Sequence, residues 1–246
     1  MPEPSERIFD FAAGELLLID KPKGWTSFDV VNKLRYRLRK LTGIKRIKVG
    51  HSGTLDPMAT GLLLIATGKA TKQLTQLTGL PKSYTGTIRF GESTPSYDAE
   101  TEPDKSYPTQ HLTSELLQQT VEQHLLGEIE QRPPMFSAIK IDGKRLYKLA
   151  RKGEQVEVPL RRVEVSRFEL TEFRLPQEVD FEVAVSKGTY VRSLAHDLGQ
   201  LSNSGAHLTA LRRTDVGAYA IDDAYTVPAF TAHLDALIDQ HAPREQ

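Results

Sequence analysis

The sequence predicts an α+β fold, in which helices flank a largely antiparallel mixed sheet. Apolar segments of strand length follow one another in runs, without the regular alternation of strand and helix that marks a parallel α/β fold. Segments with helical periodicity are spread between these runs. We see no internal repeat or low-complexity linker in the 246 residues, so one main domain is expected over residues 14–246, after an N-terminal extension of residues 1–13.

The first predicted elements are a buried strand and an amphipathic helix. Residues 15–20 form a short apolar run, and the turn residues 21–24 close it. Ser27 is expected to cap the helix and Gly43 to end it. The apolar face of this helix is predicted to consist of Phe28, Val31, Leu34, Leu38 and Leu41.

The next hundred residues contain further strands and helices between glycine-rich or proline-rich loops. Residues 84–90 alternate in polarity, which is typical of a strand with one covered face. Leucine and valine at residues 116, 117, 121 and 125 mark a helix. The remaining predictions are a loop at 49–61, a strand at 62–66, a short helix at 69–77 and a long loop at 93–110.

Residues 131–153 differ from their surroundings. The segment is basic, is broken by prolines near its start, turns at Asp142-Gly143 and ends in a short cationic helix. This pattern is typical of an arm that contacts a partner, and equally of a plain hairpin followed by a helix. After it we expect strands at 155–159, 163–174 and 180–186, a helix at 190–201, a strand at 207–214 and a helix at 229–240.

Composition excludes several classes of protein. Hydrophobic residues make up 39% of the chain and charged residues 26%, and no apolar run reaches the roughly 18 to 20 residues that span a bilayer. Residues 1–13 lack an apolar stretch of signal-peptide length, so a cytoplasmic location is expected. The absence of cysteine excludes disulfides and thiolate chemistry, and the seven histidines form no compact cluster, so no metal site is expected.

The formal net charge is zero, but the basic residues are unevenly distributed. No acidic residue lies between Val30 and Leu55. Such a patch can hold a polyanion, although a solvated helix face has the same composition. Its eight cations are Lys33, Arg35, Arg37, Arg39, Lys40, Lys45, Arg46 and Lys48.

The glycine-rich segment 50–61 contains the most promising carboxylate, Asp56. Aspartate before proline commonly starts a turn, which is the simplest interpretation of Asp56 alone. A phosphate-cradling loop is excluded, because residues 68–71 have neither the required spacing nor the required last residues. What remains is a non-helical loop with one carboxylate and one imidazole, His51, beside strongly basic sequence. Catalytic groups concentrate on such loops.

The segment 50–72 resembles the signature of the TruB-type tRNA pseudouridine synthases, and other segments resemble further motifs of that family in the same order. The matches run from about residue 14 to residue 217. They comprise the N-terminal motif at 21–27, the Lys-x-Tyr element at 82–84, the RNA-gripping thumb at 132–153, the motif of the active-site arginine at 186–194 and the last motif at 207–213.

The resemblance implies a pseudouridine synthase fold with a protruding thumb at about residues 131–153. It implies an enzyme that isomerises uridine 55 in the T arm of tRNA, with no cofactor and no obligatory protein partner. About thirty residues follow Gly217, so the form expected is one without the separate C-terminal RNA-binding domain of many relatives.

The resemblance also implies the catalytic residues. Asp56 would be the nucleophile, and whether it attacks the base or the sugar, or first helps to remove a ribose proton, stays open at this stage. Arg192 would pair with Asp56, which would lower the carboxyl pKa by about 1 to 3 units. Tyr84 would stack on the uracil and take part in proton transfer at C5. Taken alone, Arg192 could be a surface helix residue and Tyr84 a core residue.

Four further residues would serve the substrate. His51 would hold the nucleotide flipped out of its loop, and Leu211 would line the pocket. Tyr190 would support the site. Lys21 and the thumb would both contact RNA. Residues 93–98 are less acidic than in many relatives, so whether Asp98 joins a network around Arg192 stays open.

Two other functions remain possible on the sequence alone. A non-catalytic RNA-binding or RNA-folding module would use the same basic patch, but Asp56 would be replaceable. An N-glycosidic hydrolase would release free uracil, but the matched motifs supply no second carboxylate for it.

Overall fold

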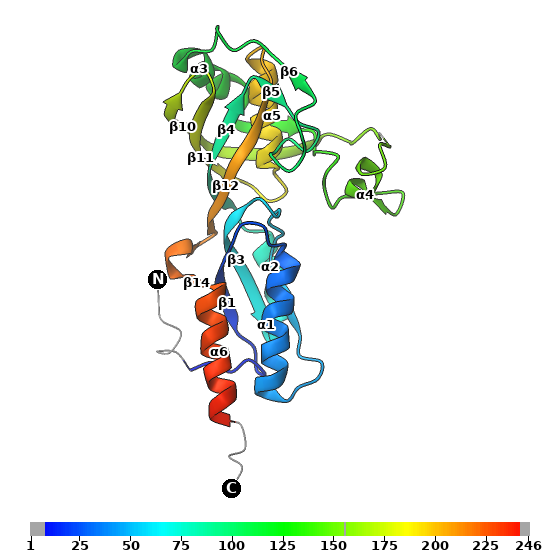
Figure 1. The fold of residues 1–246 in the computed structure, drawn as a ribbon, viewed down its shortest axis with the longest axis vertical. Helices are drawn as coiled ribbons and strands as arrows, with labels where there is room; N and C mark the ends of the chain where they lie inside the picture. The colour runs from blue at the N-terminus through cyan, green and yellow to red at the C-terminus, as the bar shows by residue number, and fades with distance from the viewer. Residues whose placement is uncertain (1–7, 155, 242–246) are drawn as a thin grey trace. The chain divides into compact units, whose positions relative to one another are not determined.

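The structure is a computed structural model that describes residues 8–154 and 156–241. It divides into two compact units (Figure 1). Unit 1 comprises residues 1–82 and 212–246, and unit 2 comprises residues 83–211. The boundaries fall within β4 (Lys82–Phe90) and β12 (Ala206–Val216), so both strands contribute residues to each unit.

Unit 1 is built around β3 (Thr60–Thr67). β1 (Leu16–Lys21) runs antiparallel to β3, with Leu16 opposite Ala66 and Lys21 opposite Gly61. β14 (Tyr225–Thr226) runs parallel to β1. On its other edge β3 pairs with the antiparallel β2 (Val49–His51). The start of β3 pairs on the same edge with the end of β12, which runs parallel to it. β13 (Tyr219–Ala220) pairs antiparallel with the last residues of β12.

Both faces of β3 are covered, which explains its unbroken apolar sequence. Leu63 and Ile65 belong to the core formed with α1 (Ser27–Thr42) and α6 (Val227–His241). Leu62 and Leu64 pack on the opposite side with Leu77, Val216 and Ala224. Helices α1 and α6 contact each other (Figure 1). Arg37 of α1 pairs with Asp235 of α6 at 2.9 Å.

The start of α1 differs from the prediction. Thr26, not Ser27, is the N-cap, and it forms a capping box with Asp29. Phe28 is 60% exposed, whereas Val30 is fully buried in its place. The buried stripe begins at Ser27 because its hydroxyl contacts the backbone of Leu55, and this contact turns Phe28 toward solvent. The end of the helix is confirmed, since Gly43 has φ +70°.

The predicted loop at 49–61 is shorter in the structure. Residues 49–51 form β2 and residues 60–61 begin β3, because both segments find backbone partners that sequence periodicity does not reveal. The short helix predicted at 69–77 is confirmed as a 3₁₀ turn, η2 (Gly68–Gln73), followed by α2 (Leu74–Thr78). A last 3₁₀ turn, η3 (Ile221–Asp223), precedes β14.

Unit 2 contains a sheet in the order β12-β4-β11-β10-β7. β10 (Arg161–Arg174) is antiparallel to both β11 (Glu178–Val185) and β7 (Gly127–Gln131). Every second side chain of β11 is buried, as expected for a strand with one covered face. Helices α3 (Ser114–His124) and α5 (Val191–Leu201) contact each other, and α3 contacts β10.

Unit 2 differs from the prediction in three places. Residues 156–159 form no strand, and Gln155 lies outside the described residues. Val158 is instead buried in the core of the thumb. β7 was not predicted, because Ile129 is its only large apolar residue. The long loop predicted at 93–110 contains a small hairpin of β5 (Glu92–Ser93) and β6 (Lys105–Ser106).

The predicted thumb is a small substructure that stands to one side of the sheet of unit 2 (Figure 1). β8 (Lys140–Ile141) and β9 (Lys144–Arg145) form a hairpin, and α4 (Leu146–Ala150) follows. Asp142 and Gly143 have φ values of +50° and +77°, as the predicted turn requires. Leu146, Leu149 and Val158 form its core, and its seven exposed cations are Arg132, Lys140, Lys144, Arg145, Lys148, Arg151 and Lys152.

The predicted α+β class, with a mixed sheet flanked by helices, is therefore confirmed. Of the predicted N-terminal extension, residues 1–7 lie outside the described residues, and Phe11 is buried in the core of unit 1. In the described part of the chain, no helix combines the length and the apolar character that crossing a membrane requires.

We predict that Gly61→Ala destabilises the protein strongly. Gly61 has φ +104°, and a Cβ atom at this position would lie 2.2 Å from the carbonyl oxygen of Arg213. Backbone strain and overpacking together should lower the free energy of unfolding by about 3–5 kcal/mol. Urea unfolding followed by circular dichroism would show this loss as a lower midpoint.

Gly43→Ala is the matched control. Gly43 also has positive φ, but a Cβ atom there would meet nothing within 4 Å, so only backbone strain of about 1–2 kcal/mol is expected. Equal losses of stability in the two variants would show that the close approach of the Arg213 backbone to Gly61 is not a steric constraint.

Candidate active site

Asp56 lies in a hydrogen-bonded turn between β2 and β3. The carbonyl oxygen of Asp56 accepts a hydrogen bond from the Ala59 amide at 3.1 Å, so the turn expected from aspartate before proline is present. The Asp56 side chain is half-buried. A turn that is fixed and still reachable from solvent can both orient a carboxylate and present it to a substrate.

Two side chains from outside the turn hold its flanks. Ser27 accepts a hydrogen bond from the Leu55 amide at 2.8 Å and donates to the Leu55 carbonyl at 3.2 Å. The ammonium of the fully buried Lys21 donates to the carbonyls of Pro22, Trp25 and Pro57 at 2.9, 2.6 and 3.5 Å. These contacts fix the residues on either side of Asp56. Contact of Lys21 with RNA stays a prediction.

Arg213 fixes the part of the loop that precedes Asp56. Its guanidinium is 2% exposed and donates to the carbonyls of Leu62 at 2.7 Å and Gly53 at 3.2 Å. Burial, and secondarily the charge of Arg213, lowers the pKa of His51. The Gly53 amide donates to Nδ1 of His51 at 3.3 Å, so the neutral imidazole carries its proton on Nε2. In its neutral form His51 can therefore act as a hydrogen-bond donor through Nε2.

In unit 2, Arg192 lies in the first turn of α5 and is 4% exposed. Its guanidinium donates to the carbonyls of Ser96 at 2.8 Å and Phe136 at 2.9 Å. The buried Asp98 carboxylate lies 3.5 Å from the same guanidinium. Asp98 thus belongs to the network around Arg192, which the sequence left open.

The other predicted site residues of unit 2 lie on three elements. Tyr190 is the N-cap of α5, and Gln131 clamps it by accepting from its amide at 2.8 Å and donating to its carbonyl at 3.1 Å. Tyr84 is half-buried in β4, and Leu211 is 8% exposed in β12. Gln131 was not predicted, because nothing in the sequence links the end of β7 to α5.

The structure therefore gathers the predicted residues in two groups. Lys21 and His51 lie with Asp56 in unit 1, whereas Arg192, Tyr84, Tyr190 and Leu211 lie in unit 2. The pairing of Asp56 with Arg192 stays a prediction. Sequence reasoning missed the roles of Ser27 and Arg213, although the pattern Thr26-x-x-Asp29 could have assigned the cap to Thr26 and released Ser27.

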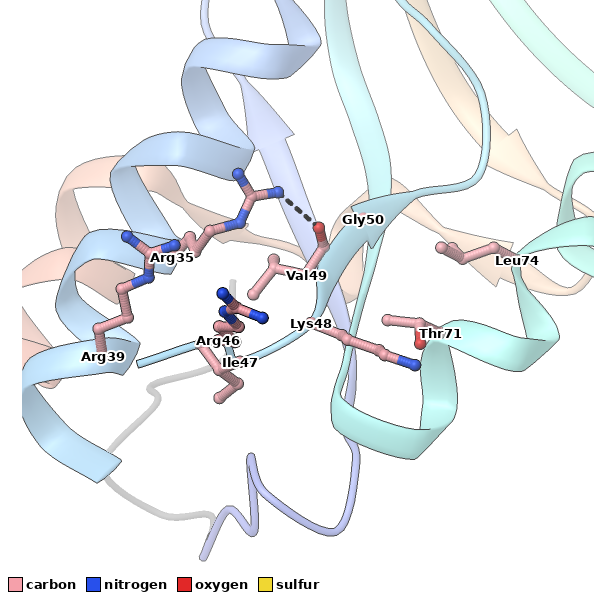
Figure 2. A pocket seen from close by; sticks show the side chains of 9 residues that line it. All are labelled: Arg35, Arg39, Arg46, Ile47, Lys48, Val49, Gly50, Thr71 and Leu74. Carbon is pink, nitrogen blue, oxygen red and sulfur yellow. Dashed lines mark hydrogen bonds between the residues drawn. The ribbon is translucent and has the colours of Figure 1, made fainter. Parts of the chain in front are cut away.

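Part of the basic patch lines a cleft of about 420 Å³ in unit 1 (Figure 2). Arg35 and Arg39 come from α1, Arg46 from the following loop, and Lys48 lies directly before β2. Arg35 is anchored by donating to the Val49 carbonyl at 2.8 Å, the bond drawn in Figure 2. Within residues 8–154 and 156–241, none of these four cations forms an ion pair, so the cleft keeps its positive charge.

The amino-acid sequence matches two family profiles. Residues 39–191 match the one described as "TruB family pseudouridylate synthase (N terminal domain)". Residues 192–243 match "tRNA pseudouridylate synthase B C-terminal domain". In the structure these latter residues include α5, β12 and α6, which lie in units 1 and 2.

Curated relatives are similar to almost the whole chain. A protein of Flavobacterium johnsoniae is 53% identical over 92% of this chain and 98% of its own length. A protein of Phocaeicola vulgatus is 51% identical over 92% and 95%. A third, from Chloroherpeton thalassium, is 52% identical over 93% of both chains. All three are named tRNA pseudouridine synthase B.

Solved structures show the same fold. A chain of a Cbf5-Nop10-Gar1 complex superposes with a TM-score of 0.68 at 29% identity, covering 94% of this chain and 57% of that one. A chain of an archaeal box H/ACA sRNP Nop10-Cbf5 complex gives 0.61 at 25% identity, with 93% and 54% covered. The chain thus spans little more than half of these longer chains. The predicted pseudouridine synthase fold is confirmed, and the chain belongs to the TruB family of pseudouridylate synthases, which are isomerases.

Proposed function

We propose that this enzyme isomerises uridine 55 in the T arm of tRNA to pseudouridine, with Asp56 as the nucleophile. The observation that carries the proposal is the position of Asp56, a half-buried carboxylate in a turn whose flanks are fixed by Ser27 and Lys21. The names of relatives at 51–53% identity support tRNA as the substrate. A fixed nucleophile is oriented before the substrate binds, which lowers the barrier.

The reaction balances without an external reagent. The glycosidic bond between N1 and C1′ breaks, the uracil turns, a bond forms between C5 and C1′, and the C5 proton is replaced by a proton at N1. Nothing is oxidised, and no group is imported. That the enzyme needs neither a cofactor nor a protein partner stays a prediction, as does its cytoplasmic location.

The remaining site residues divide the work around the flipped uridine. Tyr84 stacks on the uracil and takes part in the exchange of the C5 proton, and Arg192 orients the Asp56 carboxylate by charge. His51 donates from Nε2 to hold the flipped nucleotide. Leu211 lines the pocket, and Tyr190 supports the helix that carries Arg192.

The basic cleft and the thumb bind the RNA backbone. The cleft carries four cations without ion pairs among the described residues, and it is lined by Val49 and Gly50, which lead directly into His51 and the Asp56 loop. The thumb presents seven exposed cations around a hairpin and helix that have their own core. Phosphate neutralisation by both would give affinity, and base flipping would select the target.

Asp56→Asn should fold and bind T-arm RNA but lose turnover. The amide keeps the size of the side chain and leaves the backbone hydrogen bonds of the turn intact, but it cannot act as a nucleophile. Release of tritium from C5 of uridine in an unmodified tRNA transcript measures turnover, and filter binding measures affinity.

Asp223→Asn is the matched control, because Asp223 is an exposed carboxylate in the same unit. It should release label at the wild-type rate. Turnover retained by Asp56→Asn would remove the nucleophile from the proposal. If the wild type binds the RNA but releases no label, a non-catalytic RNA-binding module would explain the chain better, and free uracil among the products would indicate a hydrolase.

Removing two cations of the cleft should weaken binding in a salt-dependent way. Arg46→Ala with Lys48→Ala should reduce the slope of log affinity against log salt by about 1.4–1.8, because each phosphate contact contributes about 0.7–0.9. Filter binding to T-arm RNA between low and moderate salt measures the slope.

The matched control is Lys33→Ala with Lys40→Ala, which removes the same charge from α1. Lys33 and Lys40 lie over the rings of Trp25 and Tyr36 and do not line the cleft. Equal slopes for both double variants would mean that the cleft is not the docking face.

A further inference from the structure

Two of the residues that contact Arg192, Ser96 and Asp98, belong to a tight turn at residues 94–98 of unit 2. The Tyr97 amide donates to the Thr94 carbonyl at 3.1 Å, which closes the turn, and the Thr94 hydroxyl donates to the Asp98 carbonyl at 2.7 Å. Within the turn, Ser96 donates to the Asp98 carboxylate at 2.5 Å. The turn therefore presents the Ser96 carbonyl and the Asp98 carboxylate as one rigid acceptor for Arg192.

Tyr97 has an unusual backbone conformation for a large residue. Its φ is +62°, a region that side chains with a Cβ atom disfavour, so other contacts must hold the turn in this form. The Leu208 amide donates to the Tyr97 carbonyl at 3.1 Å, which fixes one side of the turn. The contact of the Tyr97 side chain fixes the other.

The Tyr97 ring stacks on His196 of α5, with ring centroids 3.9 Å apart and planes 10° apart. His196 follows Arg192 by four residues, so both side chains leave the same face of α5. The turn is thus attached to α5 at two points, one helical turn apart. The first is polar, through Arg192, and the second is aromatic, through His196.

The surroundings of His196 indicate that its ring contributes by stacking on Tyr97 and not by hydrogen bonding through Nδ1. Nδ1 is buried and has no hydrogen-bond partner among the residues that the structure describes. Burial lowers the pKa of His196, so the ring is neutral near pH 7, with Asp104 opposing this shift. No hydrogen bond of the Tyr97 hydroxyl occurs in the described parts of the chain, so the Tyr97 ring too acts by stacking.

We propose that Tyr97 and His196 are positioning residues, whose stack holds the turn at residues 94–98 so that Ser96 and Asp98 aim the guanidinium of Arg192. The proposal rests on the proposed role of Arg192 in catalysis. Without the stack, the turn is released from positive φ, and the two acceptors of Arg192 that belong to it, Ser96 and Asp98, shift with it. The reacting groups then lose alignment, while the surfaces that bind RNA are unchanged.

His196→Ala and Tyr97→Ala each remove one ring of the stack. Alanine is compatible with the middle of α5, and at residue 97 it keeps the Cβ atom that disfavours positive φ, so neither variant adds a new backbone conflict. Each should lower kcat by about ten- to a hundred-fold, the scale expected for misplacement of a catalytic group, while KM stays within two-fold of wild type. Because both variants remove the same contact, the double variant should be no slower than the slower single variant.

Conservative variants separate positioning from a general structural role. Tyr97→Phe and His196→Phe keep an aromatic face and should restore most of the wild-type kcat. Asn203→Ala controls for alanine at positive φ, because Asn203 also has positive φ, at +52°, and follows α5 in the same unit. It should leave kcat unchanged. Thermal unfolding of each variant shows whether it is folded at the assay temperature.

The measurement is single-turnover and steady-state release of tritium from C5, with Arg192→Lys included. If Arg192→Lys is inactive and the ring-removing variants turn over at the wild-type rate, the positioning role is wrong and the role of Arg192 stands. A raised KM with unchanged kcat would also overturn the proposal, because the stack would then serve RNA binding. If Arg192→Lys retains wild-type turnover, the proposed role of Arg192 itself fails, and the positioning role fails with it.

Discussion

The parallel pairing of β3 with the end of β12 is the constraint on which unit 1 depends. Gly61 lies opposite Arg213 in this pairing, and their backbones approach so closely that no Cβ atom fits at Gly61. This pairing brings the Arg213 side chain to the carbonyls of Leu62 and Gly53. Gly53 precedes the Asp56 turn in the sequence, and Leu62 follows it. A single backbone contact therefore connects the last motif of the chain to the loop that carries Asp56.

Backbone carbonyls surround the buried cations of both units. Lys21 and Arg213 in unit 1 donate to carbonyl oxygens, and Arg192 in unit 2 donates to two carbonyls besides its contact with Asp98. Carbonyl acceptors satisfy the hydrogen-bonding needs of a buried cation without cancelling its charge. Lys21 and Arg213 are therefore held in place by neutral acceptors beside the loop of Asp56, which suits the proposed role of this carboxylate.

Local signals in the sequence predicted the elements whose structure is decided locally. The apolar run of β3, the glycine that ends α1 and the Asp142-Gly143 turn of the thumb all lie where expected. Prediction from the sequence failed where a residue distant along the chain determines the local structure. β7 is a strand because β10 pairs with it, and Ser27 is buried because Leu55 lies against it.

The candidate site followed the same rule. Motif resemblance located Asp56 and Arg192, but it said nothing of how each is held. The roles of Ser27, Arg213 and Tyr97 depend on contacts across 28 to 160 residues of chain, which periodicity and spacing cannot show.

The most direct test of the proposed reaction places tritium at C5 of uridine 55 alone, in an otherwise unlabelled and unmodified tRNA. The wild-type enzyme is expected to release all of this label as water while the RNA chain stays intact. Retention of the label, under conditions in which the enzyme releases tritium from a uniformly labelled transcript, would contradict the proposal. The enzyme would then be a pseudouridine synthase with a different target.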